Sequence, residues 1–206
     1  MYPSILNQDR HDLLPLIKSF IRSYYLVGET AIGLQIGHRE SIDFDLFTDG
    51  KINIGSIKAT IRKKGFSVQR LIHEDNDQMH LIINDVKLTF FNYIYPVVAT
   101  ESFDGIIKMP NLLDLAAMKA FALGRRAKWK DYVDLYFLFK EHVTIQQVSK
   151  RAYELFDGSF NGRLFREQLA YYKGIDYSEE VVYMPNFQVS DEEVKSFLTK
   201  VSISKI

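Results

Sequence analysis

The sequence has no cysteine, no excess of either charge and no long apolar run. Its 206 residues include 26 basic and 26 acidic side chains, which gives a formal net charge of zero. The absence of cysteine excludes disulfide scaffolds, thiolate zinc sites and cysteine nucleophiles. The balanced charge argues against a generic basic protein that coats nucleic acid. No segment approaches the roughly 20 apolar residues that cross a bilayer, so we expect no membrane partner.

The first twenty residues, MYPSILNQDRHDLLPLIKSF, lack the apolar stretch and the small-residue cleavage site of a signal peptide. Together with the absence of cysteine, this predicts a cytoplasmic protein. The five histidines form no HExxH or similar spacing, which disfavours a metal hydrolase. The composition that remains, 47% hydrophobic and 25% charged, is that of an ordinary globular chain.

The hydrophobic pattern predicts a mixed first half and a helical second half. Helices are expected over residues 9–22, 30–36 and 55–65, and strands over 24–27, 42–47, 66–72, 79–83 and 86–91. Asn84-Asp85 suits a tight turn between the last two strands. After Pro110 we expect helices over 112–123 and about 130–140, and two more that begin at the capping-box patterns of Thr144 and Ser190. The predicted fold class is therefore α+β: a mixed sheet flanked by helices over residues 1–109, followed by a helical C-terminal subdomain over 110–206.

Gly28 stands where a short strand meets a short helix that is expected to begin near Thr30. Glycine lets the backbone approach a ligand closely, and the first turn of a helix offers N–H groups and the positive end of the helix dipole. These features are typical of a phosphate-binding turn. Taken alone, these residues favour the alternative, an ordinary strand-to-helix connection.

Asp43 and Asp45 lie two apart on an alternating strand, so both carboxylates project from one face of it. Two close carboxylates repel each other unless a cation lies between them. Oxygen ligands of this kind suit Mg²⁺, which binds one or two carboxylates together with substrate phosphates. A solvated strand face is the alternative, but the phosphate-binding turn just before the pair favours a metal site.

Two segments together resemble a known family, the AbiEii/AbiGii toxins. These are nucleotidyltransferases of the polymerase-β superfold, many of them toxins of type IV toxin–antitoxin systems. The first segment is Gly28-x-Thr30 followed by His38-Arg39-x-Ser41-x-Asp43-Phe44-Asp45-Leu46-Phe47. The second is Leu115-Ala116-Ala117-Met118-Lys119, then Arg125-Arg126 and Lys130-Asp131-Tyr132-Val133-Asp134-Leu135. The resemblance covers about residues 20–140 and implies a polymerase-β-like core before the helical subdomain.

The resemblance also implies a role for individual residues. Asp43 and Asp45 would bind Mg²⁺ and align a nucleoside triphosphate for in-line attack. Lys119 would contact a phosphate, and Asp131 or Asp134 would orient Lys119 or an acceptor hydroxyl. Six residues would hold the nucleotide, its phosphates at the first three: Gly28, Glu29, Thr30, His38, Arg39 and Ser41. Independently of the family, Lys119 interrupts an apolar helix, where a lysine is costly unless it pairs or reaches solvent.

Two positions depart from the family pattern. Glu29 replaces the usual second glycine, and a carboxylate there repels a triphosphate unless it points away or joins the metal site. Thr89 stands where the superfold supplies a third carboxylate, so a second Mg²⁺ would be held poorly or not at all. Either Glu29 or Asp85 compensates, or the pair works alone, or the protein binds nucleotide without transferring it.

The zero net charge hides two basic blocks. Residues 51–72 contain six basic and no acidic side chains, and residues 115–130 contain five and none. Such blocks attract a nucleotide or an RNA backbone. The alternatives are a solvated helix face for the first block and a surface ion pair of Lys130 with Asp134.

Three functions follow from these observations. The first is Mg²⁺-dependent transfer of a nucleoside monophosphate from a nucleoside triphosphate to a hydroxyl of RNA, such as tRNA, or of a protein. That enzyme would be the toxin of a type IV pair, with a cognate antitoxin as partner. The second is transfer to a small, aminoglycoside-like molecule. The third is a degenerate member that binds nucleotide or a partner protein without turnover.

Overall fold

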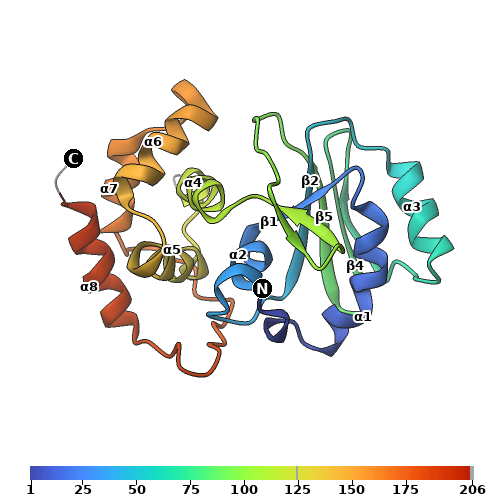
Figure 1. Ribbon diagram of the computed structural model, residues 1–206, viewed down its shortest axis with the longest axis horizontal. Helices are drawn as coiled ribbons and strands as arrows, with labels where there is room; N and C mark the ends of the chain where they lie inside the picture. The colour runs from blue at the N-terminus through green and yellow to red at the C-terminus, as the bar shows by residue number, and fades with distance from the viewer. Residues whose placement is uncertain (124, 205–206) are drawn as a thin grey trace. The chain divides into compact units, whose positions relative to one another are not determined.

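The computed structural model describes residues 1–123 and 125–204, and the chain divides into two compact units, the first ending at Asn111 and the second beginning at Leu112 (Figure 1). The first unit contains the sheets, and the second is built from helices. This arrangement confirms the predicted α+β fold class. The expected division into a nucleotidyltransferase core over 1–109 and a helical C-terminal subdomain over 110–206 stays a prediction. Within the described residues, no helix is long and apolar enough to cross a membrane.

The first unit contains one five-stranded sheet and one small hairpin. The five strands are β1 (Tyr25–Val27), β2 (Asp43–Thr48), β3 (Arg70–Glu74), β4 (Gln78–Ile83) and β5 (Val86–Asn92). The hairpin is β6 (Glu101–Phe103) with β7 (Ile107–Met109). The helical segments are the 3₁₀ turn η1 (Pro3–Ile5), α1 (Gln8–Ile17), the 3₁₀ turn η2 (Lys18–Phe20), α2 (Gly28–Ile36) and α3 (Ile54–Lys63).

The strands of the large sheet run in the order β1-β2-β5-β4-β3, with β2 and β5 parallel and the other neighbours antiparallel. One face is apolar, and α1 and α3 lie along that side (Figure 1). Phe90 of β5 shows the packing: the rings of Phe20 and Tyr24 meet it edge-on, with centroid distances of 4.9 and 5.3 Å. Burial of such large rings supplies most of the drive to form this layer.

The opposite face carries polar side chains in a row. The strand register pairs Asp45 with Thr89, Thr89 with His80, and His80 with His73. Directly paired residues of neighbouring strands project to the same face of a sheet. The three side chains of Asp45, Thr89 and His80 therefore lie next to one another on β2, β5 and β4.

Two further rows flank this one. Asp43 pairs with Lys87 on one side of it, and on the other side Tyr25, Phe47 and Phe91 form an aromatic row. The rings of Phe47 and Phe91 are 5.2 Å apart. The face opposite the core thus changes from charged to aromatic within four residues of β2.

Local sequence signals account for most element boundaries in the first unit. Asn84 and Asp85 both have positive φ, at 50° and 59°, which confirms the predicted tight hairpin turn. Gly37 ends α2 in the left-handed conformation, directly after the predicted helix over 30–36. The strand expected over 66–72 is displaced to 70–74, because Gly65 is left-handed and Phe66 donates back to the carbonyl of Ile61. The β6–β7 hairpin was not predicted.

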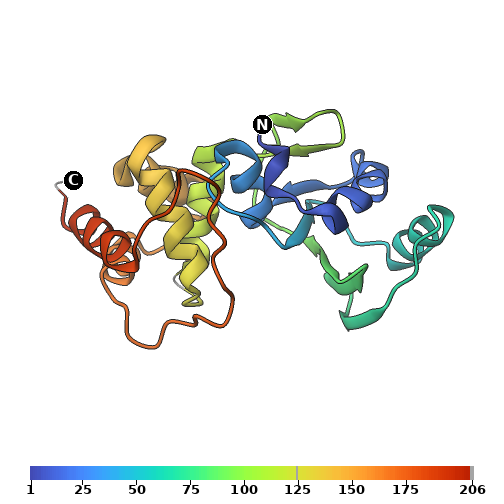
Figure 2. The same cartoon turned by 90° about the horizontal axis from the view of Figure 1, so that it is seen from below.

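The second unit consists of α4 (Leu112–Leu123), α5 (Trp129–Glu141), α6 (Ile145–Phe156), the 3₁₀ turn η3 (Asp157–Ser159), α7 (Gly162–Leu169) and α8 (Asp191–Ser202). Thr144 and Gln147 form the complete capping box expected of them. At the other predicted box Ser190 accepts the N–H of Glu193, whose carboxylate accepts from the hydroxyl of Tyr136. A long segment without helix or strand joins α7 to α8 (Figure 2).

Candidate functional site

Asp43 and Asp45 lie on β2 and project from the face opposite the core, while Phe44 between them is buried. The alternation read from the sequence is therefore confirmed. Lys87, the register neighbour of Asp43 on β5, places its Nζ 3.8 Å from Asp43 Oδ2. This ammonium group reduces the repulsion between the two carboxylates. Both side chains remain partly exposed, at 40% for Lys87 and 26% for Asp43.

Gly28 lies directly against this pair. Its φ is +71°, and a Cβ built on it would fall 2.5 Å from Asp45 Oδ2. Helix α2 begins at Gly28 itself, two residues earlier than expected, and the cap residue Val27 provides no side-chain hydrogen bond. The first turn of α2 and the carboxylate of Asp45 thus meet at one point of the backbone, where only a residue without a side chain fits.

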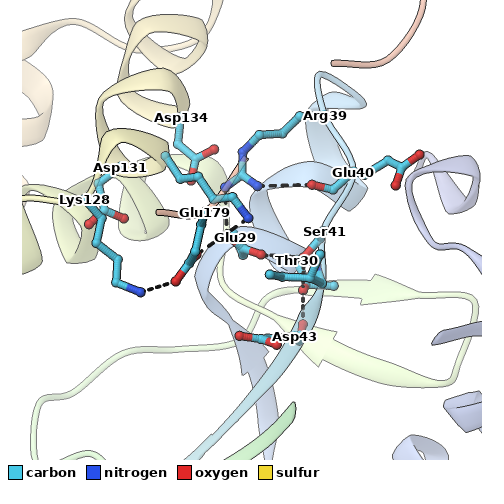
Figure 3. A network of polar contacts seen from close by, with 12 residues as sticks. Glu29, Thr30, Arg39, Glu40, Ser41, Asp43, Lys128, Asp131, Asp134 and Glu179 are labelled. Atoms are coloured by element: carbon cyan, nitrogen blue, oxygen red, sulfur yellow. Dashed lines mark hydrogen bonds and ion pairs between the residues drawn. The ribbon is translucent and has the colours of Figure 1, made fainter. Parts of the chain in front are cut away.

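Glu29, the departure from the family pattern, is held by a buried arginine (Figure 3). Arg39 Nη2 lies 3.0 Å from Glu29 Oε2, and the Ser41 hydroxyl and the Ile42 N–H donate to Glu29 Oε1 at 3.2 Å each. Arg39 is only 1% exposed and also donates to the carbonyl of Glu40. The guanidinium group compensates the charge of Glu29, which offsets the repulsion expected at this position.

Thr30 and Ser41 connect α2 to the start of β2. The Thr30 hydroxyl donates to the carbonyl oxygen of Asp43 and lies 2.5 Å from the Ser41 hydroxyl (Figure 3). Both residues are buried, as is His38 in the connection before β2. These bonds hold the backbone of Asp43 in place, and direct contact of Thr30, Ser41 or His38 with a nucleotide stays a prediction.

The second unit has its own charged cluster. Lys119 of α4 places Nζ 2.9 Å from Asp131 Oδ1 and 2.8 Å from Asp134 Oδ2, both on α5. All three residues are buried. The structure therefore supplies the pairing that a lysine in an apolar helix requires. Arg126 adds two bonds to the carboxylate of Asp131, at 2.9 and 3.1 Å, while remaining half-exposed.

The cations of this cluster compensate the buried charge of Asp131. Burial alone would raise the pKa of the Asp131 carboxyl, but Lys119 and Arg126 outweigh burial and hold that pKa below its usual range.

The surface ion pair considered for Lys130 and Asp134 is wrong. Asp134 is fully buried against Lys119, whereas Lys130 lies 3.6 Å from Glu179, in the segment between α7 and α8. Lys128 also pairs with Glu179 (Figure 3).

The metal-binding capacity of the first unit is limited to a pair. Among residues 1–123 and 125–204, no group of three or more histidine, aspartate or glutamate side chains is arranged to hold a metal ion. Neither Glu29 nor Asp85 therefore supplies the missing third carboxylate: Glu29 is bound to Arg39, and Asp85 lies in the β4–β5 turn, where it bonds Gln69. Two adjacent carboxylates beside a glycine turn still fit a Mg²⁺ ion that takes its remaining ligands from phosphates and water.

Several residues of these clusters were not predicted. Lys87 and His80 reach the carboxylate face through strand register, which the sequence alone does not reveal. Asp114, in the first turn of α4, is buried and binds Arg151 of α6 through two hydrogen bonds of 2.5 and 3.2 Å. In this case the sequence offered a signal, since a lone aspartate near apolar residues needs a cationic partner.

The fold is similar to that of solved nucleotidyltransferase structures. Among solved structures, JHP933 from Helicobacter pylori superposes with a TM-score of 0.62 at 19% identity, covering 96% of this chain and 91% of its own. MenT4, a nucleotidyltransferase toxin from Mycobacterium tuberculosis, gives 0.59 at 13% identity, covering 95% and 81%. These likenesses establish the fold, and the family model described next gives the class of enzyme, a nucleotidyltransferase.

The family follows from the sequence comparison. The model of the family described as nucleotidyl transferase AbiEii toxin, type IV TA system, matches residues 18–200, so the chain belongs to this family. An uncharacterized protein of Aquifex aeolicus (strain VF5) is 28% identical over 203 residues, 95% of each chain. The resemblance seen in residues 20–140 is confirmed and extends through most of the helical unit.

Proposed function

We propose that this protein transfers a nucleoside monophosphate from a nucleoside triphosphate to an acceptor hydroxyl of RNA, with release of pyrophosphate and a requirement for Mg²⁺. One observation supports this most strongly. The carboxylates of Asp43 and Asp45 share the open face of the sheet, and Asp45 lies against Gly28 at the first residue of α2. A metal-binding pair and a phosphate-binding turn in contact are what such a transfer needs.

Each site residue of the first unit has a separate proposed role in binding the metal ion or the triphosphate. Asp43 and Asp45 would hold Mg²⁺, which supplies charge neutralisation and alignment of the triphosphate. Gly28 lets the phosphates approach the first N–H groups of α2 without a Cβ in the way. Lys87 is placed to stabilise the negative charge that gathers at the departing phosphates. Arg39 prevents Glu29 from opposing this binding.

Lys119, Asp131 and Asp134 remain proposed catalytic residues of the second unit. Two carboxylates fix the Nζ of Lys119, so its charge is positioned before any substrate binds. Arg126 is the member of this cluster with substantial exposure, at 52%, and is suited to meet a phosphate oxygen. The proposal is that the cluster neutralises phosphate charge with Lys119 as its fixed component.

An RNA acceptor is supported by the exposed basic block. Arg62, Lys63 and Lys64 at the end of α3, and Arg70 on β3, are all exposed. Because α3 covers the core side of the sheet, these side chains would hold acceptor phosphates at a distance from the reacting hydroxyl. A long polyanion such as tRNA can make such contacts, and an aminoglycoside-sized molecule cannot. In keeping with the family, modification of RNA would make the protein a toxin opposed by a cognate antitoxin.

The test compares two labels in one assay. The protein is incubated with each nucleoside triphosphate, Mg²⁺ and total RNA, with the label on the α-phosphate in one series and on the γ-phosphate in the other. Transfer of α-label but not γ-label to RNA, with pyrophosphate release that stops on chelation of Mg²⁺, is the expected result. Asp43→Asn is the inactive control.

Other outcomes identify the alternatives. If the label enters protein instead of RNA, the acceptor is a protein and the proposed transfer reaction still stands. Pyrophosphate release only with small hydroxylated molecules indicates the second function considered above. Calorimetric binding of a nucleotide without any transfer indicates a degenerate member. Growth arrest on expression, relieved by a neighbouring gene, tests the toxin and antitoxin roles separately.

A further inference from the structure

Thr89 occupies the sheet position next to Asp45 where the fold normally carries a third carboxylate, and it does not stand alone. Its Oγ1 lies 3.3 Å from Nδ1 of His80, its register neighbour on β4. The row across the sheet is therefore carboxylate, hydroxyl, imidazole. Thr89 is 5% exposed, and His80 is partly buried, so this contact is shielded from bulk water.

The neighbouring residues fix which nitrogen of His80 carries the proton. Asp75 Oδ2, which can only accept, lies 3.1 Å from Gln78 Nε2, so the amide nitrogen of Gln78 faces Asp75. The amide oxygen of Gln78 then faces His80 Nε2 at 3.0 Å. An oxygen can only accept there, so Nε2 is protonated and Nδ1 carries a lone pair. The Thr89 hydroxyl donates to that lone pair.

Burial and the surrounding charges together favour the neutral form of His80. Burial, followed by Lys87 of β5 and His73 of β3, lowers the pKa of the imidazole below its usual value, while Asp45 of β2 and Asp75 act in the opposite direction. A neutral imidazole with a free lone pair is a competent proton acceptor near pH 7. The hydrogen bonds form a chain that could relay a proton. Asp75 orients Gln78, Gln78 orients His80, and His80 accepts the hydrogen bond of Thr89.

We propose that Thr89 and His80 together replace the third carboxylate as the proton acceptor for the attacking hydroxyl. This inference rests on the proposed transfer reaction. The acceptor hydroxyl donates its proton to Thr89 Oγ1 while Thr89 passes its own proton to His80 Nδ1. The acceptor oxygen forms a bond to the α-phosphorus, the bond from that phosphorus to the pyrophosphate oxygen breaks, and the proton later leaves His80 for solvent.

The decisive variant is His80→Asn, because the asparagine oxygen can still accept a hydrogen bond from Thr89 but cannot take up a proton. We expect its kcat for α-label transfer to fall about 100-fold, with little change in KM. His142→Asn, at an exposed histidine after α5, is the matched control and keeps wild-type activity. Thr89→Ser keeps the relay and stays active, and Thr89→Val interrupts it.

A rescue experiment separates the relay from a structural role. Thr89→Asp restores a carboxylate beside Asp45, so we expect it to raise the activity of His80→Asn at least about 10-fold. In the wild-type protein the rate rises with pH as His80 loses its proton, below its ordinary value of about 6.5, and this limb is absent from His80→Asn. Profiles from about pH 5 to 8 measure the difference.

The outcomes distinguish this inference from the function on which it rests. If the wild-type protein transfers no label with any nucleotide or acceptor, the proposed function and the relay both fail. If the wild-type protein is active and His80→Asn retains kcat within about threefold with an unchanged pH profile, the relay alone is overturned. Failure of Thr89→Asp to raise the activity of a folded His80→Asn protein also overturns it.

Discussion

The carboxylate of Asp45 lies against the Cα of Gly28, so closely that a methyl group on Gly28 would fall 2.5 Å from Asp45 Oδ2. The two residues come from β2 and from the first position of α2. The proposed phosphate-binding turn and the proposed metal-binding pair are therefore in direct contact, and we expect a change in either to displace the other.

Gly28→Ala tests this contact against a matched glycine. Gly65 has a similar φ of +80° but no atom within 4 Å of a built Cβ, so Gly65→Ala carries only the left-handed strain, about 1–2 kcal/mol. Gly28→Ala adds a clash with Asp45, and we expect a further loss of about 1–3 kcal/mol in the free energy of unfolding. Urea denaturation measures both. Equal losses of unfolding free energy in the two variants would show that Asp45 moves aside without an energetic cost.

Neutralising Asp43 or Asp45 should reduce activity without reducing stability. Asp43→Asn and Asp45→Asn relieve charge repulsion, so we expect an unchanged or slightly higher free energy of unfolding. Nucleotide transfer should fall at least about 100-fold, because the metal-binding pair is lost. The α-label assay and urea denaturation check the two expectations. Glu101→Gln, on β6, is the control for a loss of charge and should behave as wild type.

The buried pair of Arg39 and Glu29 should behave as a coupled unit. Arg39→Met leaves the carboxylate of Glu29 without its guanidinium, and we expect destabilisation of about 3–5 kcal/mol. Adding Glu29→Gln removes the stranded charge, so the double variant should be more stable than the sum of the single effects by more than about 1 kcal/mol. A double-mutant cycle measured by denaturation gives the coupling, and strictly additive losses would contradict it.

Acid should weaken the helical unit through Asp131. The pKa of this carboxyl is held below its usual range, so its contribution to stability is complete above the unfolded-state pKa of about 3.9 and is lost as the pH falls through the folded value. The free energy of unfolding of the wild type should therefore fall steeply below about pH 4, and that of Asp131→Asn should fall less. Parallel slopes for the two proteins would count against the assignment.

Lys119→Met provides the complementary test. Removing the ammonium group leaves Asp131 and Asp134 buried with one fewer counter-charge, and we expect a loss of about 3–5 kcal/mol at neutral pH. Because the stranded carboxylates are relieved by protonation, the variant should lose less of its remaining stability than the wild type on acidification. Thermal unfolding between about pH 7 and 3 measures this, and retained wild-type stability would show that Lys119 is dispensable to the fold.

The elements and the carboxylate pair could be predicted because their signals are local. Period-two alternation placed Asp43 and Asp45 on one face, and turn chemistry located the hairpin at Asn84 and Asp85. The fold class followed from the order of such segments and from the family resemblance of the two motifs.

The partners within the site could not be predicted, because they depend on how distant segments pair. No local sequence signal places Thr89 beside both Asp45 and His80, because their proximity depends on the register of three strands. The compensation of Glu29 by Arg39 likewise needs the turn after α2 to fold back on its first residues. Short strands such as β6 and β7 carry too few residues for a clear period.

The parallel pairing of β2 with β5 also means that the candidate site is assembled from segments made at different times. Asp43 and Asp45 are synthesised before Lys87 and Thr89, because α3 and the β3–β4 hairpin lie between them in the chain. Pairings of such high sequence separation form late. A nascent chain that stops before Lys87 has both carboxylates but not the neighbours that complete their row, so the candidate site is incomplete until β5 is made.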